Sequence, residues 1–183
     1  MFYYVVVISL ISITQYLYAN DKKKMNIETI PSSFELIQLD RWEKSECTPK
    51  MDIFKERGIV LNSPEKVLIS EEFILPLCGI WTFSEKFINE HPTIDTDTTL
   101  VVTDKSNFKS YSANLARPDF EYEPRSKSTG TEEELNFNAE QSYFNINVYD
   151  YVVKLPKKRG VFSIYATIGD VKSNVVEIEI ITK

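Results

Sequence analysis

Few residues in this chain could do chemistry. Residues 93–99 place Asp95 and Asp97 two positions apart between threonines, and on a loop two such carboxylates could share a hard cation. The segment lacks the glycine and the distant glutamate of an EF-hand loop, so a solvated turn is the simpler interpretation. The only histidine, His91, has no partner at the spacing of metal ligands. We therefore expect no metal and no cofactor.

Motifs of known enzyme classes are also missing. The sequence contains no G-x-S-x-G nucleophile turn, no P-loop, no dinucleotide-binding glycine turn and no H-E-x-x-H. Five glycines in 183 residues exclude most loops that cradle phosphate groups. A single histidine is a thin basis for acid–base catalysis. We expect a protein that is not an enzyme and that has no catalytic residue.

The charge balance argues against nucleic acid as a partner. The formal net charge is −6, and the basic residues form only two short clusters instead of a stripe. The simplest explanation of the negative charge is an acidic, solvated surface, and the alternative is that the surface binds a basic protein. With 43% hydrophobic and 26% charged residues, the chain fits one globular domain with a sizeable core.

The chain begins with a segment that resembles a signal peptide, and the strands that could position a site follow it. Residues 2–19 are uncharged and largely apolar, end in the small residue Ala19 and are followed by a polar segment, as in a signal peptide. No basic residue precedes this run, and Leu17 stands where a small residue is usual. The lysines at positions 22–24 would favour an uncleaved, inverted anchor, and a buried N-terminal element is a further alternative.

Whether the two cysteines, Cys47 and Cys78, form a disulfide depends on the compartment. In an oxidising compartment an even pair invites one disulfide, and closing a loop of this length would stabilise the fold by about 3 to 4 kcal/mol. The alternative is two separate buried thiols. A metal site is disfavoured because the cysteines lack a CxxC spacing.

Short runs with a period of two dominate the chain. In one of them Phe144, Ile146 and Val148 alternate with Asn145 and Asn147, so one face of the strand is buried and the other meets water. Such half-solvated strands predict an all-β fold with antiparallel sheets. We expect strands within residues 33–39, 58–61, 66–69, 73–83, 98–104, 108–115, 143–155 and 160–180. Only residues 64–73 and 84–91 offer a helical turn.

Residues 116–141 break this pattern. They contain two prolines, a glycine and many charges, which predict a long loop inserted between strands. Because loops on a rigid β scaffold are frequent recognition sites, we expect partner contacts here, at Asp119, Phe120, Glu121, Tyr122 and Glu123. The alternative is that the two rings fold back onto the edge of the sheets.

The last strands carry a resemblance. The segment "LPKKRGVFSIYATIGDVKSNVVEIEI", residues 155–180, is similar to the ending of many secreted bacterial Ig-like and fibronectin-III-like domains. In these domains an aromatic residue near the start of the penultimate strand closes a corner, and Phe162 holds that place. Its ring can fill the core but has no hydroxyl. The resemblance implies an antiparallel Ig-like β-sandwich, and it implies no particular function.

Two classes of function fit these features. The first is an exported, non-enzymatic protein that binds another protein, such as an immunity protein acting on a toxin or an inhibitor of a secreted hydrolase. The second is a structural or adhesive module of a surface assembly that pairs by strand addition. Small size, acidity, a signal-like leader and missing catalytic motifs favour the first class.

We predict cleavage of a signal peptide comprising residues 1–19. The remaining residues, 20–183, would form a single β-sandwich domain in the periplasm or outside the cell, and would meet a membrane only if the leader stays attached. N-terminal sequencing of the native protein should find a chain that begins near Asn20. Recovery of intact Met1 in a membrane pellet would show an anchor instead.

Overall fold

The computed structural model describes residue 39 and residues 42–53, 55–69, 73–116 and 125–182. In this part of the chain, strands predominate and the helices are short. The strands are β1 (Gly58–Asn62), β2 (Lys66–Ile69), β3 (Pro76–Ser84), β4 (Thr99–Asp104), β5 (Lys109–Asn114), β6 (Ala139–Asn147), β7 (Gly160–Ile168), β8 (Val171–Lys172) and β9 (Val176–Thr182). The helices are α3 (Glu85–Glu90), α4 (Ile94–Asp97), α5 (Glu132–Phe137) and α6 (Val148–Tyr151). The predicted β-rich character is confirmed.

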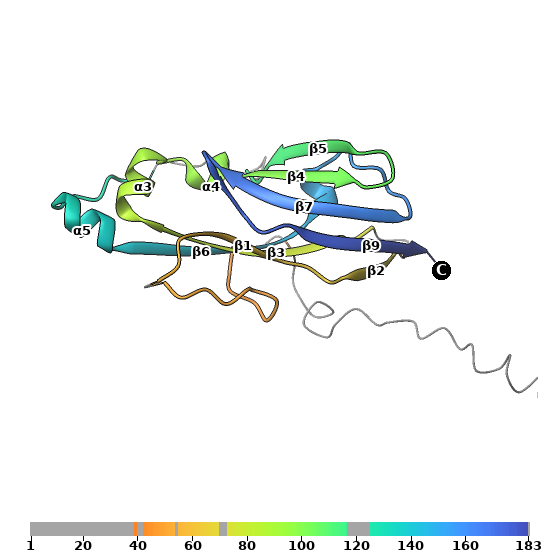
Figure 1. Cartoon of the computed structure of the whole chain (residues 1–183), viewed down its shortest axis with the longest axis horizontal. Helices are drawn as coiled ribbons and strands as arrows, with labels where there is room; N and C mark the ends of the chain where they lie inside the picture. Colours follow the sequence, from red (N-terminus) through yellow and green to blue (C-terminus); the bar gives the residue numbers. More distant parts are fainter. Residues whose placement is uncertain (1–38, 40–41, 54, 70–72, 117–124, 183) are drawn as a thin grey trace, which may run out of the picture.

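The strands form two sheets, which lie in two layers (Figure 1). The smaller sheet has the order β1-β3-β6, with antiparallel neighbours. The larger sheet has the order β2-β9-β7-β4-β5, and β8 pairs with β7. Its neighbours are antiparallel except for β2 and β9, which run parallel. The expectation of purely antiparallel pairing is therefore wrong for β2, and the larger sheet is mixed.

The parallel pair arises where the chain changes sheets. Between β1 and β2 lie residues 63–65, which include Pro64. Proline has no backbone N–H, so it cannot extend the ladder that β1 forms with β3. Figure 1 shows β2 continuing in the direction of β1. Nearby, Asn174 ties the sheets together, because its side-chain amide accepts from the N–H of Leu61 at 2.7 Å and donates to the carbonyl of Leu61 at 3.0 Å.

Side chains from both sheets fill one hydrophobic core. On β7 of the larger sheet, Phe162, Ile164 and Ala166 are fully buried while the residues between them are partly exposed, as the alternation predicted. Trp81 on β3 and Ile146 on β6 bury against them in the same cluster from the smaller sheet. Full burial of one large apolar side chain contributes about 1.5 to 3 kcal/mol, so the contact between the sheets is a main source of stability.

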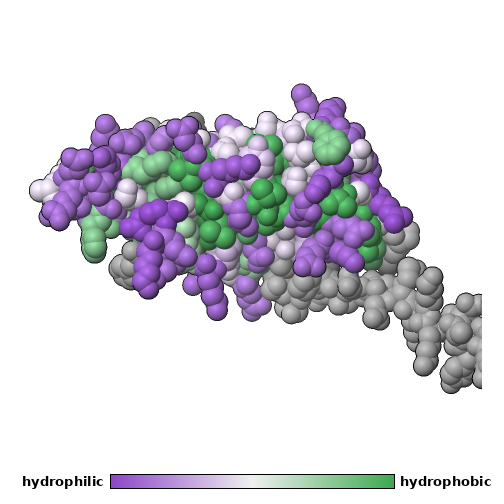
Figure 2. All heavy atoms as spheres, viewed as in Figure 1, coloured by the Kyte–Doolittle hydropathy of each residue, from purple (hydrophilic) through white to green (hydrophobic). Residues whose placement is uncertain are grey.

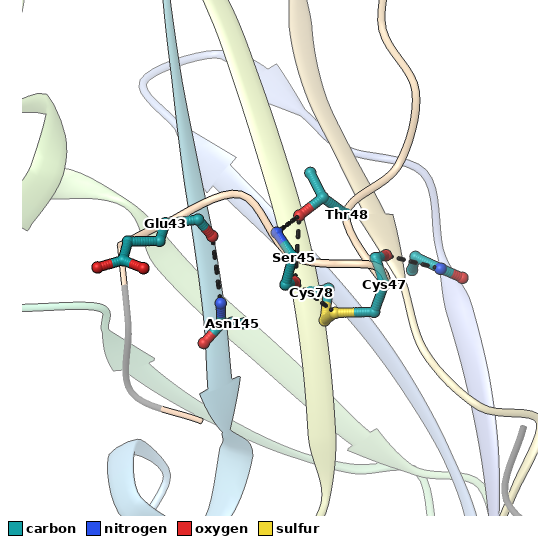
Figure 3. The surroundings of a disulfide bond; sticks show 7 residues. Glu43, Ser45, Cys47, Thr48, Cys78 and Asn145 are labelled. Carbon is teal, nitrogen blue, oxygen red and sulfur yellow. Dashed lines mark hydrogen bonds between the residues drawn. A yellow bond between two sulfur atoms is a disulfide. The ribbon is translucent and has the colours of Figure 1, made fainter. Parts of the chain in front are cut away.

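A disulfide covers the outer face of the smaller sheet. Leu77 on β3 belongs to the core, so the next residue, Cys78, faces the opposite way. There it is bonded to Cys47, with the Cα atoms 5.9 Å apart, which agrees with the pairing predicted from the sequence. Figure 3 shows the segment around Cys47 crossing β3 and β6, where Nδ2 of Asn145 donates to the carbonyl of Glu43 at 3.2 Å. As a result, β3 is covered on both faces and only its last residue is partly exposed.

The short helices depart from the sequence predictions in part. Residues 84–91 contain α3, as expected, but residues 64–73 contain β2 and no described helix. Val148–Tyr151 forms α6 where a strand was expected. The cause is Asn147, whose side-chain oxygen accepts from the N–H of Leu75 at 2.9 Å and from the N–H of Tyr149 at 3.3 Å, which ends β6 and caps the helix.

The predicted loop at residues 116–141 is also not continuous. Within its described part, it contains α5 and the start of β6, so the loop prediction is wrong there. Thr131 and Glu134 form a capping box: the Thr131 hydroxyl accepts from the Glu134 N–H at 3.3 Å, and the Glu134 carboxylate accepts from the Thr131 N–H at 2.8 Å. No helix in the described ranges is long and apolar enough to cross a bilayer.

We predict that the disulfide is a major contribution to stability. The double variant Cys47→Ala/Cys78→Ala should lose about 3 to 4 kcal/mol of unfolding free energy, because the unfolded chain is no longer restrained by the closed loop. Chemical denaturation with and without a reductant measures this. Thiol titration of the unfolded, unreduced protein should find no free thiol, and two free thiols per chain would contradict the bond.

Candidate binding surface

The polar residues first considered for catalysis or metal binding do not gather into one site. Residues 93–99 contain α4, and there the Thr93 hydroxyl donates to the Asp97 carboxylate at 2.6 Å; the side chain of Asp95 lies outside what the structure describes. The ring of His91 packs against Phe87, with the centroids 4.3 Å apart. Among the described residues, no three His, Cys, Asp or Glu side chains are placed to hold a metal ion.

Within the described ranges, the ionisable groups with shifted pKa values are all moved away from neutrality. Burial raises the pKa of Tyr149 to about 12. The hydrogen bond between Lys86 and Glu132, 2.7 Å long, raises the pKa of the lysine and lowers that of the glutamate. The hydrogen bond from the Thr131 backbone lowers the pKa of Glu134. Each of these groups keeps its ordinary charge at neutral pH, where a general acid or base would need a pKa close to 7.

A buried carboxylate organises the turn between β4 and β5. Asp104, at the end of β4, is fully buried, and its Oδ2 lies 2.6 Å from the Nζ of Lys158. Its Oδ1 accepts from the N–H of Ser106 at 2.9 Å and from the Ser106 hydroxyl at 2.6 Å. The hydrogen bond from Lys158 is the main cause that lowers the pKa of Asp104 to about 2, and the bonds from Ser106 add to it. The turn is thereby fastened to the segment that precedes β7.

The tip of this hairpin presents Phe108 to solvent. The Phe108 N–H donates to the carbonyl of Asp104 at 2.8 Å, and the side chain of Asn107 accepts from the N–H of Lys109 at 2.9 Å. These bonds hold Phe108 at a φ of 57°, the only positive φ of a non-glycine residue in the described chain. A bulky residue rarely adopts this left-handed conformation, which costs about 1 to 2 kcal/mol. The ring is nonetheless 80% exposed.

Lysines from two segments meet at this end of the molecule. Lys158 reaches the turn through Asp104, and Lys157 beside it lies over the ring of Phe73, 5.0 Å from the centroid. Lys109 lies over the ring of Tyr111, 5.2 Å from its centroid, and Lys105 pairs with a glutamate on β9. The hairpin tip therefore combines an exposed ring with positive charge, although the chain as a whole is acidic.

The opposite end of the molecule carries α3 and α5 (Figure 1). Hydrophilic side chains gather over this end (Figure 2). Phe137, the last residue of α5, is 76% exposed and shares a shallow hollow with Glu132, Glu133 and Asn136. This end thus offers an exposed ring beside carboxylates, the combination that the sequence analysis expected of the loop residues.

The loop residues expected to bind a partner, Asp119, Phe120, Glu121, Tyr122 and Glu123, lie outside the described residues, so their role stays a prediction. Neither Phe108 nor Phe137 was among the residues predicted to bind a partner. The local signal for Phe108 was an aromatic residue within the polar run "DKSNFKS", at the first residue of the strand predicted within residues 108–115.

We predict that Asp104 stabilises the fold in a pH-dependent way. The pKa of Asp104 falls from its ordinary 3.8 to about 2 in the folded state, so its contribution is complete above pH 3.8 and is lost as the pH falls towards 2. Asp104→Asn should lose about 2 kcal/mol of unfolding free energy at pH 7. The difference from the wild type should shrink between pH 4 and pH 2 in urea denaturation.

The exposed Asp150 on α6 offers a control with the same change of charge. Asp150→Asn should leave stability nearly unchanged at every pH. Equal losses for the two variants, or a loss for Asp104→Asn that persists undiminished at pH 2, would contradict the role of the buried ion pair.

Among the described residues, the exposed large hydrophobic side chains thus include two phenylalanine rings, one at each end of the molecule. Phe108 is held rigidly by hydrogen bonds within its turn, and Phe137 ends a short helix. Neither a protein-family model nor a curated protein matches this chain.

Proposed function

We propose that this chain is an exported, non-enzymatic protein-binding domain that acts by covering the surface of another protein. Immunity proteins of toxins and inhibitors of secreted hydrolases act in this way. The observation that carries the proposal is Phe108, an exposed ring held in a strained backbone conformation at the tip of a rigid turn.

The strand order supports an Ig-like arrangement of the domain. One sheet has the order β1-β3-β6 and the other ends in β9-β7-β4-β5. In Ig domains, strands A, B and E share one sheet, and strands G, F, C and C′ follow one another in the other. Phe162 lies near the start of β7, which corresponds to strand F in this comparison. In such domains recognition commonly uses the loops at the ends of the sandwich.

The disulfide supports an oxidising compartment. Disulfides persist in the periplasm and outside the cell, and are rare where thiols are kept reduced. Cys47 and Cys78 are both buried and bonded to each other. Together with the signal-like residues 1–19, they favour export.

Phe108 carries the proposal because its position is costly within the isolated chain. Its left-handed backbone costs about 1 to 2 kcal/mol, and asparagine or glycine would adopt it more easily. The exposed ring recovers little of this cost by burial. A partner that buries the ring would recover it, and aromatic side chains near the centre of an interface often contribute most of the binding energy.

The charge at the tip defines the partner's surface. Lys109 and Lys157 are exposed, and they lie on the two segments that meet there. A partner should therefore offer an apolar pocket for the ring, with carboxylates at its rim. Such charges at a rim mainly raise the association rate and its dependence on salt.

We predict opposite effects of Phe108→Asn on stability and on binding. Asparagine tolerates the left-handed conformation, so the unfolding free energy should rise by about 1 kcal/mol. Binding to the partner recovered from an envelope or secreted fraction of the native organism should weaken by about 2 kcal/mol. Denaturation and calorimetric titration measure the two effects.

Phe137→Ala is the matched control, because it removes a similarly exposed ring at the other end of the molecule. It should leave binding unchanged. Loss of binding in Phe137→Ala with full binding in Phe108→Asn would move the site to α5. A marked loss of stability in Phe108→Asn would show that the ring serves the fold.

A further inference from the structure

We infer that the outer edge of β5 is a docking site for an extended, carboxylate-bearing segment of another protein, which adds to the larger sheet as a new strand. The inference rests on the proposed function, since it supposes a protein partner, but it concerns the edge of β5, which shares Lys109 with the hairpin tip, and a different kind of contact. Three observations carry it: the direction of the β5 backbone groups, a groove beside the strand, and the charge of that groove.

Strand β5 ends the larger sheet, and among the described residues it pairs with β4 alone. The N–H of Leu115, just after β5, donates to the carbonyl of Thr98, just before β4. Because the direction of backbone groups alternates along a strand, those of Tyr111 and Ala113 also face β4. The N–H and C=O groups of Ser110, Ser112 and Asn114 therefore point outward, along the open edge.

An open strand edge is a template for pairing with another chain, and proteins usually protect it with proline, bulges or several charges. The sequence of β5 is KSYSAN, which has no proline and one charge at its first residue. The residues whose backbone groups point outward, Ser110, Ser112 and Asn114, carry small exposed side chains that stand on the solvent face of the sheet. A neighbouring backbone could therefore approach the edge at the usual strand spacing of about 4.8 Å.

A groove of about 540 Å³ lies beside this edge, between residues 109–112 of β5 and residues 151–154. The side chains of Tyr111 and Ala113 pack partly against the core, so the groove lies on the inner side of the strand. An extended chain paired with β5 would direct every second side chain into the groove and the others into solvent. Tyr111 offers apolar surface there, and Val153 at the rim is 82% exposed.

The charge of the groove selects the occupant. Lys109 and Lys154 both line it, and both are exposed. A segment with carboxylates beside an apolar residue complements this surface. A second copy of β5 does not, because KSYSAN contains no acidic residue and would bring further lysine. We therefore assign the site to an acidic segment of a different protein, added by β-strand pairing.

The test uses one substitution that removes an outward hydrogen bond and one that does not. Ser112→Pro deletes an outward N–H while the ladder between β5 and β4 stays intact, and Ser112→Ala keeps that N–H. The probe is a phage library of random dodecapeptides, selected on the full chain. Selected peptides should be rich in Asp and Glu beside aliphatic residues. Their affinity should be unchanged within twofold for Ser112→Ala, and at least tenfold weaker for Ser112→Pro and for Lys109→Glu/Lys154→Glu.

Amide hydrogen exchange of the unsubstituted chain gives a second measurement, which holds even if Ser112→Pro does not fold. A bound peptide should slow exchange at least tenfold at Ser110, Ser112 and Asn114, and leave Tyr111 and Ala113 nearly unchanged. Failure to recover acidic peptides, equal affinity for Ser112→Pro, or no slowing at the three outward amides overturns the inference. If the inference about β5 fails but Phe108→Asn still loses binding to the native partner, the proposed function stands. If Phe108→Asn keeps that binding, the proposed function fails as well.

Discussion

The ion pair between Asp104 and Lys158 is the constraint on which the hairpin end of this molecule depends. A carboxylate that is fully buried must be paired or hydrogen-bonded, and Asp104 meets this demand with Lys158 and Ser106. In doing so it joins three segments: the end of β4, the turn before β5 and the residues that lead into β7. The same residue also holds the backbone of Phe108, because the Asp104 carbonyl accepts from the Phe108 N–H.

The two ends of the molecule differ in charge and in construction. The end with α3 and α5 carries several exposed glutamates, and its helix is held by a capping box and by the pair of Lys86 with Glu132. The other end carries lysines on loops and on a hairpin. The net charge of −6 hides this division, so the whole-chain charge is a poor guide to the charge of either end.

Much of the β architecture could be predicted from sequence, because residues 160–180 alternate apolar and polar side chains at the period of a strand. The parallel placement of β2 could not, since periodicity does not report which neighbour a strand has. Helix α5 could have been predicted from the capping-box residues Thr131 and Glu134, but the polar composition around them favoured a loop. Phe108 shows the deeper limit: the polar run around it signals its exposure, but the positive φ, which accompanies the hydrogen bond from its N–H to the Asp104 carbonyl, is not encoded by residue types, because phenylalanine rarely adopts it.

The disulfide also determines how the domain would carry mechanical load. Cys47 precedes β1 and β2 in the chain, and it is bonded to Cys78 within β3. Tension applied on the N-terminal side of Cys47 would pass through the sulfur atoms directly into β3, so the 31-residue loop containing β1 and β2 would bear none of it. That loop could otherwise release roughly 100 Å of chain when pulled straight. With the disulfide intact, the segment in which the chain passes from β1 in one sheet to β2 in the other carries no load, while β3 does.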